Sequence, residues 1–267
     1  RLIAQADVDR AMKLSSTYDL VEELGALLRA EKTLASVSSS SRMHRDLFRA
    51  RVLQNLAQTH SFNRDIEPKT RLAMLTPLWS ESLALKRQHG DLQGQALTLG
   101  TQGNFFNWTL RDHPAALALY EEDLTLIEKM GDDSQLSSIK NRIALVHFAM
   151  AQGTEEPLKT ERTEKALRLA KEALEWGIKL DREGDIAFAA AEVMRFAGAL
   201  NRSEDFSEAL GSATQKDIWM RFGDLAKMSK TYSDLSGEAE RLGQSEGLEA
   251  LLAMIQGVSD ARAQSAG

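Results

Sequence analysis

Apolar residues recur every three or four positions along most of this chain, the spacing of amphipathic α-helices. Two helices are expected within residues 1–36, before a run of four serines that ends at Ser41. Beyond that run, the pattern predicts helices at 42–59, 68–89, 95–107, 114–130, 136–152, 163–180, 186–200, 205–222, 225–242 and 246–262. Because almost no segment shows the alternation of a strand, the fold is expected to be all-α.

Gly-Asp pairs punctuate this helical pattern. They begin at Gly90, Gly131, Gly184 and Gly223, at intervals of 41, 53 and 39 residues. Glycine can end a helix in the left-handed conformation, and the aspartate after it can cap the next helix. We therefore expect each pair to separate two helical hairpins, in a stack that repeats about every 40 residues. The long interval holds a polar insertion at 153–162, where this chain is expected to differ most from a regular repeat.

Short motifs inside the hairpins resemble the longer variety of tetratricopeptide (TPR) repeat. The stretch Leu53-Gln54-Asn55-Leu56-Ala57 matches the motif of the first helix of such a repeat. The stretch Asp205-Phe206-Ser207-Glu208-Ala209-Leu210 matches its turn into the second helix, and Asp112-His113-Pro114-Ala115-Ala116-Leu117 matches it with His in place of the aromatic residue. Small residues stand where two helices must approach closely, at Gly103, Ala144, Ala197, Ala116 and Ala209.

Residues 42–240 thus resemble the TPR superfamily, in the long-repeat type of kinesin light chains, LGN-type polarity adaptors and sensor regions of bacterial signalling ATPases. The resemblance implies an all-α, right-handed α-α superhelix, a TPR-like solenoid. We expect a capping helical hairpin at 1–37, the repeat array at 42–242, and a C-terminal capping helix and tail at 246–267, since terminal repeats need a polar outer face.

The chain departs from the repeat pattern in places. The turn glycine is Arg111 in one repeat and Glu204 in another, and the loop at 60–67 is longer than usual. Pro77 falls inside the helix expected at 68–89, where proline removes a hydrogen bond and clashes with the preceding turn. Two interpretations stay open: the helix kinks at Pro77, or a new helix starts there.

Composition and charge narrow the classes of partner. Cysteine is absent, which excludes disulfides and thiolate metal sites and fits a cytoplasmic protein. The net charge of −6 argues against nucleic acid or an anionic membrane as partner. No apolar run approaches the roughly 20 residues that span a bilayer. The chain starts at Arg1 without a signal peptide, so we interpret it as one module of a larger protein.

The sequence offers no candidate for catalysis. It lacks a phosphate-binding loop, a zinc-protease helix motif and a nucleophile elbow. The histidines are not spaced as metal ligands, and the acidic clusters lie on helices or in polar loops where carboxylates are usually solvated. We therefore expect no catalytic residue, no metal and no cofactor.

The candidate binding residues come from the resemblance. TPR-like repeats usually bind peptides on the inner face of their first helices, and alignment assigns five polar side chains to it: Asn104, Asn107, Arg142, Arg195 and Arg202. Asparagine can bond an extended backbone, and arginine can clasp a carboxylate with two bonds. The alternative for these five is ordinary solvated surface.

Two further sets of residues are candidates. Arg42, Arg45 and Arg49 share one helix face, which is either a basic surface for an acidic partner or a solvated face. Phe105, Phe106 and Trp108 crowd one repeat turn, as core residues or as an aromatic anchor for a peptide.

The sequence thus predicts a scaffold that binds a protein or peptide in its concave groove, without catalysis. The alternative is a sensor or regulatory domain that binds an effector within a multi-domain NTPase, protease or transcription regulator.

Overall fold

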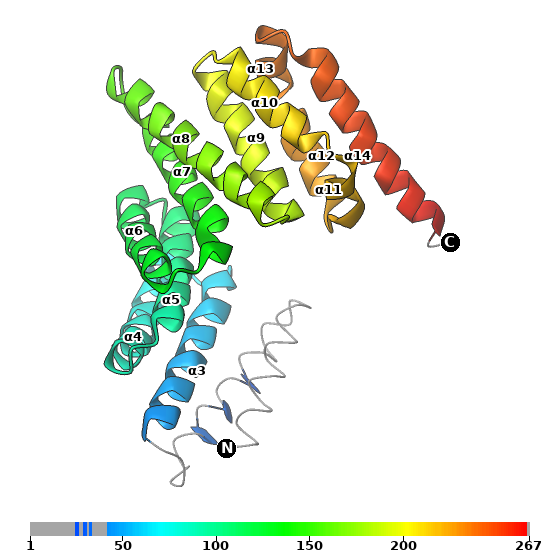
Figure 1. The fold of residues 1–267 in the computed structure, drawn as a ribbon. Helices are drawn as coiled ribbons and strands as arrows, with labels where there is room; N and C mark the ends of the chain where they lie inside the picture. The colour runs from blue at the N-terminus through cyan, green and yellow to red at the C-terminus, as the bar shows by residue number, and fades with distance from the viewer. Residues whose placement is uncertain (1–24, 27–28, 31, 34–41, 266–267) are drawn as a thin grey trace. The chain divides into compact units, whose positions relative to one another are not determined.

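The computed structural model describes residues 25–26, 29–30, 32–33 and 42–265, and this part of the chain contains helices and no strand (Figure 1). It confirms the all-α prediction. The chain divides into two compact units, Arg1–Gly131 (unit 1) and Asp132–Gly267 (unit 2). The expected capping hairpin at 1–37 lies outside the described residues except at six positions, so it stays a prediction.

From residue 42 on, unit 1 consists of two helical hairpins. Its described helices are α3 (Arg42–Phe62), α4 (Pro68–Gln88), α5 (Leu92–Asn104), a π-helical segment η1 (Phe105–Leu110) and α6 (His113–Met130). Helix α3 packs on α4, and α5 packs on α6. Helix α4 runs unbroken through Pro77, so the interpretation in which a new helix starts there is wrong. Buried Trp79 of α4 contacts Phe105, with ring centroids 5.6 Å apart, and joins the hairpins into one core.

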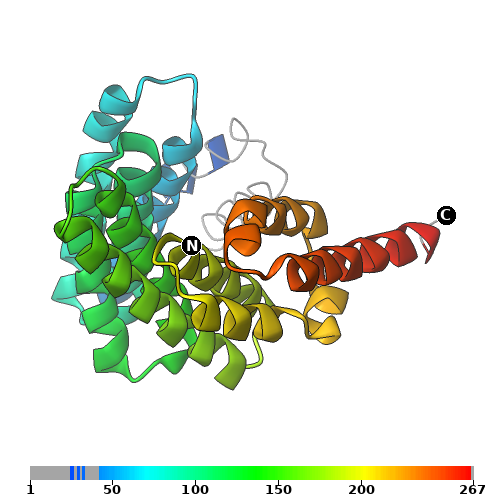
Figure 2. The same ribbon diagram turned by 90° about the horizontal axis from the view of Figure 1, so that it is seen from above.

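Unit 2 continues the hairpin arrangement around one hydrophobic core. Its helices are η2 (Asp133–Gln135, a 3-10 turn), α7 (Leu136–Gln152), α8 (Leu158–Lys179), α9 (Glu183–Ala199), α10 (Ser203–Ala213), α11 (Lys216–Arg221), α12 (Leu225–Ser233), α13 (Ser236–Arg241) and α14 (Ser245–Ser265). Figure 1 shows α7 beside α8 and α9 beside α10, as the helix contacts require. Helix α14 packs on α12 and α13 and ends the chain (Figure 2).

Six of the turns between the described helices share one backbone geometry. A residue with positive φ stands two places before the first residue of the next helix, at Gly90, Arg111, Gly131, Asp181, Asn201 and Gly243. A left-handed residue there releases the chain from one helix and lets the next residue cap the following one. Two of the four Gly-Asp predictions are therefore correct, at Gly90 and Gly131.

The other two Gly-Asp pairs behave differently. Gly184 lies inside α9, and Asp181 takes the left-handed conformation in its place. Gly223 does not have positive φ, although Asp224 caps α12 by accepting the N–H of Lys227 at 3.1 Å. In the repeat turn before α10, the left-handed position is Asn201 rather than Glu204.

Substitution at one of these turns tests the geometry. Gly243→Ala is expected to lower the free energy of unfolding by about 1 kcal/mol, because φ is +70° while nothing lies within 4 Å of an added Cβ. The matched control is Gly257→Ala in α14, which also meets open space but has ordinary helical φ. It should stabilise by about 0.5–1 kcal/mol. The denaturation midpoints of the two variants are measured by circular dichroism and compared with that of the wild type. Equal shifts in the two variants would contradict the prediction that the left-handed conformation at Gly243 makes the difference.

Two helices that the pattern predicts as continuous are broken. The helix expected at 205–222 stops at Ala213 and resumes at Lys216, because the buried indole of Trp219 donates its N–H to the Ala213 carbonyl at 2.7 Å. The helix expected at 225–242 is interrupted between Ser233 and Ser236. Their hydroxyls bond backbone carbonyls three residues earlier, which competes with regular helix.

The polar insertion expected at 153–162 is shorter than predicted. Helix α8 already begins at Leu158, which leaves residues 153–157 as the loop. The carboxylate of Glu156 accepts the backbone N–H of Thr160 at 3.2 Å and its hydroxyl at 2.6 Å. A carboxylate at the start of a helix satisfies a free N–H and suits the helix dipole, which extends α8 into polar sequence.

Candidate binding surface

Polar and aromatic side chains interrupt the alanine-rich sequence of α9 and form a stripe along the helix. They stand at Asp185, Phe188, Glu192 and Arg195, three or four residues apart, so they share one face of the helix. Helix α7 packs beside α9 and contributes Asn141 and Arg142. A pocket of about 150 Å³ lies between these helices. We call this surface the α7–α9 face; its residues are Asn141, Arg142, Asp185, Phe188, Glu192 and Arg195.

Three buried oxygen atoms of the α7–α9 face accept no hydrogen bond from the described residues: Asn141 Oδ1, Asp185 Oδ2 and Glu192 Oε2. The two carboxylate oxygens form ion pairs, Asp185 Oδ2 with Arg182 Nε at 3.3 Å and Glu192 Oε2 with Arg195 Nη1 at 3.1 Å, whereas Asn141 Oδ1 has no polar partner among the described residues. An unpaired buried acceptor costs about 1–3 kcal/mol. A ligand that donates hydrogen bonds here would recover that free energy.

Burial also sets the protonation of the two carboxyl groups on this face. It raises the pKa of Asp185, and the nearby guanidinium groups of Arg182 and Arg142 offset only part of the shift. It likewise raises the pKa of Glu192, which Arg195 partly offsets. Both groups therefore lie in an environment poor in water, where a hydrogen bond from a ligand is stronger than at an open surface.

Phe188 gives the face an aromatic wall. Its ring packs edge-on against Phe222, with centroids 5.9 Å apart, and the ammonium of Lys227 lies 5.0 Å from its centre. Phe222 follows the last residue of α11, and Lys227 lies in α12, so contacts with two further elements hold the ring. The face thus combines one positioned aromatic ring with hydrogen-bonding groups.

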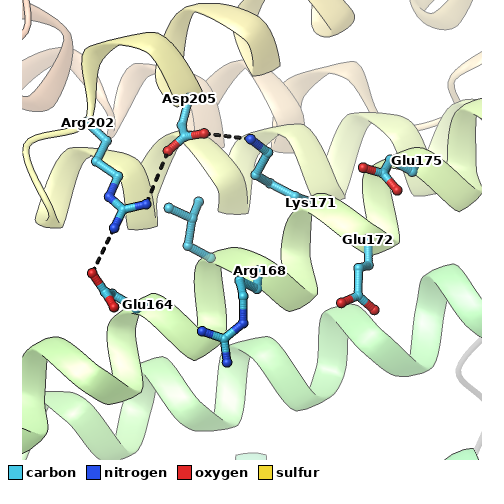
Figure 3. Close-up of a pocket in the computed structure, with 8 residues that line it drawn as sticks. Glu164, Arg168, Lys171, Glu172, Glu175, Arg202 and Asp205 are labelled. Carbon is cyan, nitrogen blue, oxygen red and sulfur yellow. Dashed lines mark hydrogen bonds and ion pairs between the residues drawn. The ribbon is translucent and has the colours of Figure 1, made fainter.

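Of the five candidate residues, Arg142 and Arg195 lie on the α7–α9 face, but Arg202 does not. Arg202 stands at the start of α10 and forms ion pairs with Glu164 at 2.7 Å and Asp205 at 3.8 Å (Figure 3). It lines a groove of about 370 Å³ between α8 and α10, on the second helices of two hairpins. The expectation that Arg202 shares a face with the first helices is therefore wrong.

The α8–α10 groove largely neutralises its own charges. Lys171 reaches Asp205 at 2.6 Å, next to the pair of Arg202 and Glu164 (Figure 3). Lys171 also lies 3.5 Å from Glu208. These exposed and half-exposed pairs leave little net field for a ligand to complement. We therefore regard the groove as a hairpin contact with a compensated surface.

Asn104 and Asn107 belong to unit 1, where both hold a turn together. Asn107 is 2% exposed, and its Oδ1 lies 2.9 Å from His113 Nδ1. Asn104 accepts the hydroxyl of Tyr120 at 2.7 Å, and the Tyr120 ring covers Gly103 so closely that an added Cβ would lie 2.5 Å away. The close approach expected at Gly103 is thus confirmed, whereas placing Asn107 on a binding face is wrong because its side chain is buried.

The basic face expected on α3 carries its own acidic partners. Arg49 Nε lies 2.6 Å from Glu81 of α4, and Arg42 lies 3.6 Å from Asp46. Arg45 also interacts within the structure. These three arginines therefore do not form an uncompensated positive surface, which weakens the interpretation as a site for an acidic partner.

The three aromatic residues at the repeat turn have different environments: two pack in the core, and one is exposed. Phe105 is buried against Trp79, and Phe106 packs partly buried on the same cluster, as the core alternative expects. Trp108 lies in the π-helical segment and is 52% exposed. Only Trp108 could meet a partner without rearrangement.

Sequence reasoning missed Asn141, Asp185, Phe188 and Glu192. A signal existed for three of them, because residues 185, 188 and 192 interrupt the alanine-rich α9 at helical spacing. It was obscured by the Gly-Asp pattern, which assigned Asp185 to a helix cap. Asn141 gives no such signal, since its unpaired oxygen is visible only when the positions of its neighbours are known.

Other classes of site are not found in the described part of the chain. No three His, Cys, Asp or Glu side chains there are grouped to hold a metal ion. Among these same residues, no helix is both long enough and apolar enough to cross a bilayer.

Comparison with known proteins identifies the fold. No protein-family model matches the chain, and no curated protein matches it in sequence. Among solved structures, it is similar to the crystal structure of BtubC (BKLC) from P. vanneervenii, with a TM-score of 0.68 and 16% sequence identity. The match covers 91% of this chain and 92% of BtubC. The chain therefore has the fold of an all-helical repeat protein over nearly its whole length.

Proposed function

We propose that this chain is a non-catalytic binding protein of TPR-like repeats, and that its α7–α9 face holds a segment of another protein. The observation that carries this is the set of three buried acceptors on α7 and α9 that receive no hydrogen bond. Folded proteins pair nearly all such atoms, so each one calls for an explanation. Donors from a bound segment would satisfy these atoms.

The dimensions of the face favour a polypeptide over a small molecule. Pockets for drug-sized ligands usually have about 300–1,000 Å³, well above the 150 Å³ found here. The stripe from Asp185 to Arg195 extends roughly 15 Å along α9, from the helical rise of about 1.5 Å per residue. An extended segment of four or five residues covers that length at about 3.3 Å per residue.

Arg142 supplies the complementary donors. Its guanidinium makes no hydrogen bond or ion pair within the described chain, although it lies near enough to influence Asp185. An unengaged guanidinium can bond carbonyl or carboxylate oxygens of a bound segment in a fixed geometry. The face therefore offers both donors and acceptors, as an extended backbone requires.

The test is selection from a phage-displayed library of random peptides on the purified chain. Hydrogen–deuterium exchange should show that a selected peptide protects α7 and α9. The double variant Asn141→Leu with Arg142→Ala should weaken binding at least about tenfold, since it removes bonds worth roughly 1.4 kcal/mol or more. The matched control, Arg168→Ala with Glu175→Ala in the α8–α10 groove, should bind as the wild type does. Protection confined to other helices, or equal affinity of the double variant, would refute the proposal.

A further inference from the structure

The pocket between α7 and α9 has the size of one side chain. Its volume is about 150 Å³, and its walls come from Ser137, Ser138, Asn141, Arg142, Asp185 and Phe188. A water molecule occupies about 30 Å³ in the liquid, so the pocket holds only a few waters. A single side chain of a bound segment fills such a space, whereas a larger ligand does not.

The hydrogen-bonding groups in the pocket are few and of known type. Two buried acceptors that receive no hydrogen bond belong to residues that line it. Asn141 Oδ1 has no polar partner in the described chain, and Asp185 Oδ2 forms an ion pair with Arg182 Nε at 3.3 Å. Arg142 contributes donors that are not engaged elsewhere in the described chain. The Ser137 hydroxyl is already committed, because it donates to the Ala173 carbonyl at 2.7 Å.

These groups discriminate among side chains. A ligand carboxylate has no hydrogen to offer the two acceptors and would face Asp185. An ammonium or guanidinium would face the cations Arg142 and Arg182, both close to Asp185. An apolar side chain would leave Asn141 Oδ1 unpaired, at a cost of about 1–3 kcal/mol. A neutral carboxamide has two N–H donors for the acceptors and one carbonyl for a donor.

We propose that the pocket between α7 and α9 binds the side-chain carboxamide of an asparagine or glutamine in the bound segment. This inference rests on the proposed peptide binding at the same face. The carboxamide NH₂ donates to Asn141 Oδ1 and Asp185 Oδ2, and its carbonyl accepts from the Arg142 guanidinium. The Phe188 ring gives the methylene groups of the side chain an apolar wall.

Small probes test the pocket without a peptide. Propanamide, propanoate and propylammonium are each titrated into the isotope-labelled chain, and shifts of the Asn141 side-chain amide and the Arg142 Nε–H are followed by NMR. Propanamide should shift both signals and bind at least about tenfold more tightly than either ion, about 1.4 kcal/mol. Asn141→Leu should abolish the Arg142 shift, while Gln152→Ala, an exposed position on the same helix, should leave both shifts unchanged.

Peptides separate the two proposals. In a selected peptide that protects α7 and α9, changing the essential glutamine or asparagine to its acid should weaken binding at least tenfold. Bound peptides that tolerate the change, together with no propanamide shift, overturn the carboxamide pocket and leave peptide binding standing. Propanamide binding with no selected peptide on this face overturns the proposed function, and it leaves standing only the preference of the pocket for a carboxamide.

Discussion

Replacing Trp219 with alanine is expected to lower the free energy of unfolding of unit 2 by about 3–5 kcal/mol, the range for removing a buried tryptophan. Trp219 is 0% exposed. Its ring lies 5.9 Å from that of Phe222 and 5.6 Å from that of Tyr232, in a perpendicular arrangement with the latter. The change removes these contacts and the hydrogen bond to the Ala213 carbonyl.

The loss should be felt beyond α11, because α14 is anchored to the same segment. Arg262 of α14 donates to the carbonyls of Phe222 and Met220 at 2.6 Å and to that of Trp219 at 3.1 Å. If α11 loses its packing, these carbonyls are no longer held in place to accept hydrogen bonds from Arg262. Hydrogen exchange in Trp219→Ala should therefore speed up in both α11 and α14.

Met220→Ala is the control for this prediction. Met220 is the next residue along the chain and is 52% exposed, so its truncation should change stability by less than about 0.5 kcal/mol. Guanidinium denaturation followed by circular dichroism gives both values. Similar costs for the two substitutions would show that Trp219 does not hold this part of the core.

The helices could be predicted because burial follows the helical period, and the all-helical repeat fold could be predicted from their regular spacing along the chain. Gly90 and Gly131 were identifiable as left-handed turn residues, since glycine adopts that conformation without cost. Asp181 was not, because a non-glycine residue adopts the left-handed conformation only at a cost in free energy, so its residue type does not mark the position. The break before α11 likewise depends on where the Trp219 indole finds an acceptor.

The binding surface could be predicted only in part. Arg142 and Arg195 were assigned to this face by alignment with the repeat pattern, and both lie on first helices of hairpins, where the direction of a side chain follows from its position along the helix. Arg202 was misplaced because its direction is decided by Glu164, 38 residues earlier on α8. Whether a buried acceptor receives a hydrogen bond depends on side chains that the fold brings close from other parts of the sequence. No local sequence pattern therefore shows that an oxygen of Asn141 or Glu192 receives none.

The second large effect is expected at Lys86, whose ammonium is enclosed in unit 1. The side chain is 2% exposed and donates to Gln54 Oε1 at 2.5 Å and to Thr98 Oγ1 at 2.7 Å. Neither partner carries charge. Burial therefore lowers the pKa of Lys86 from 10.5 to about 8, although the nearby carboxylate of Asp91 opposes the shift.

The lowered pKa of Lys86 fixes the direction of a pH effect on stability. Between pH 8 and 10.5 the unfolded chain holds the lysine proton while the folded chain has released it. The free energy of unfolding should thus rise with pH across this window, by up to about 1.4 kcal/mol per pH unit and roughly 3 kcal/mol in all. Below pH 8 Lys86 is protonated in both the folded and the unfolded chain. Its contribution to the free energy of unfolding is therefore constant there, and lower than at high pH.

Lys86→Met should remove this rise while keeping the volume of the side chain. Gln54 Oε1 need not lose its hydrogen bond, because the Thr98 hydroxyl lies 3.2 Å away and can donate to it. Lys129→Met, on an exposed position of α6, should keep the pH dependence of the wild type. The measurement is the urea midpoint of the three proteins between pH 7.5 and 9.5. This range is chosen because it lies below the ordinary pKa of tyrosine, so tyrosine side chains do not contribute to the change. The prediction is wrong if the free energy of unfolding of the wild type falls as the pH rises. It is also wrong if the free energy of unfolding of Lys86→Met rises with pH as steeply as that of the wild type, because another group would then cause the pH dependence.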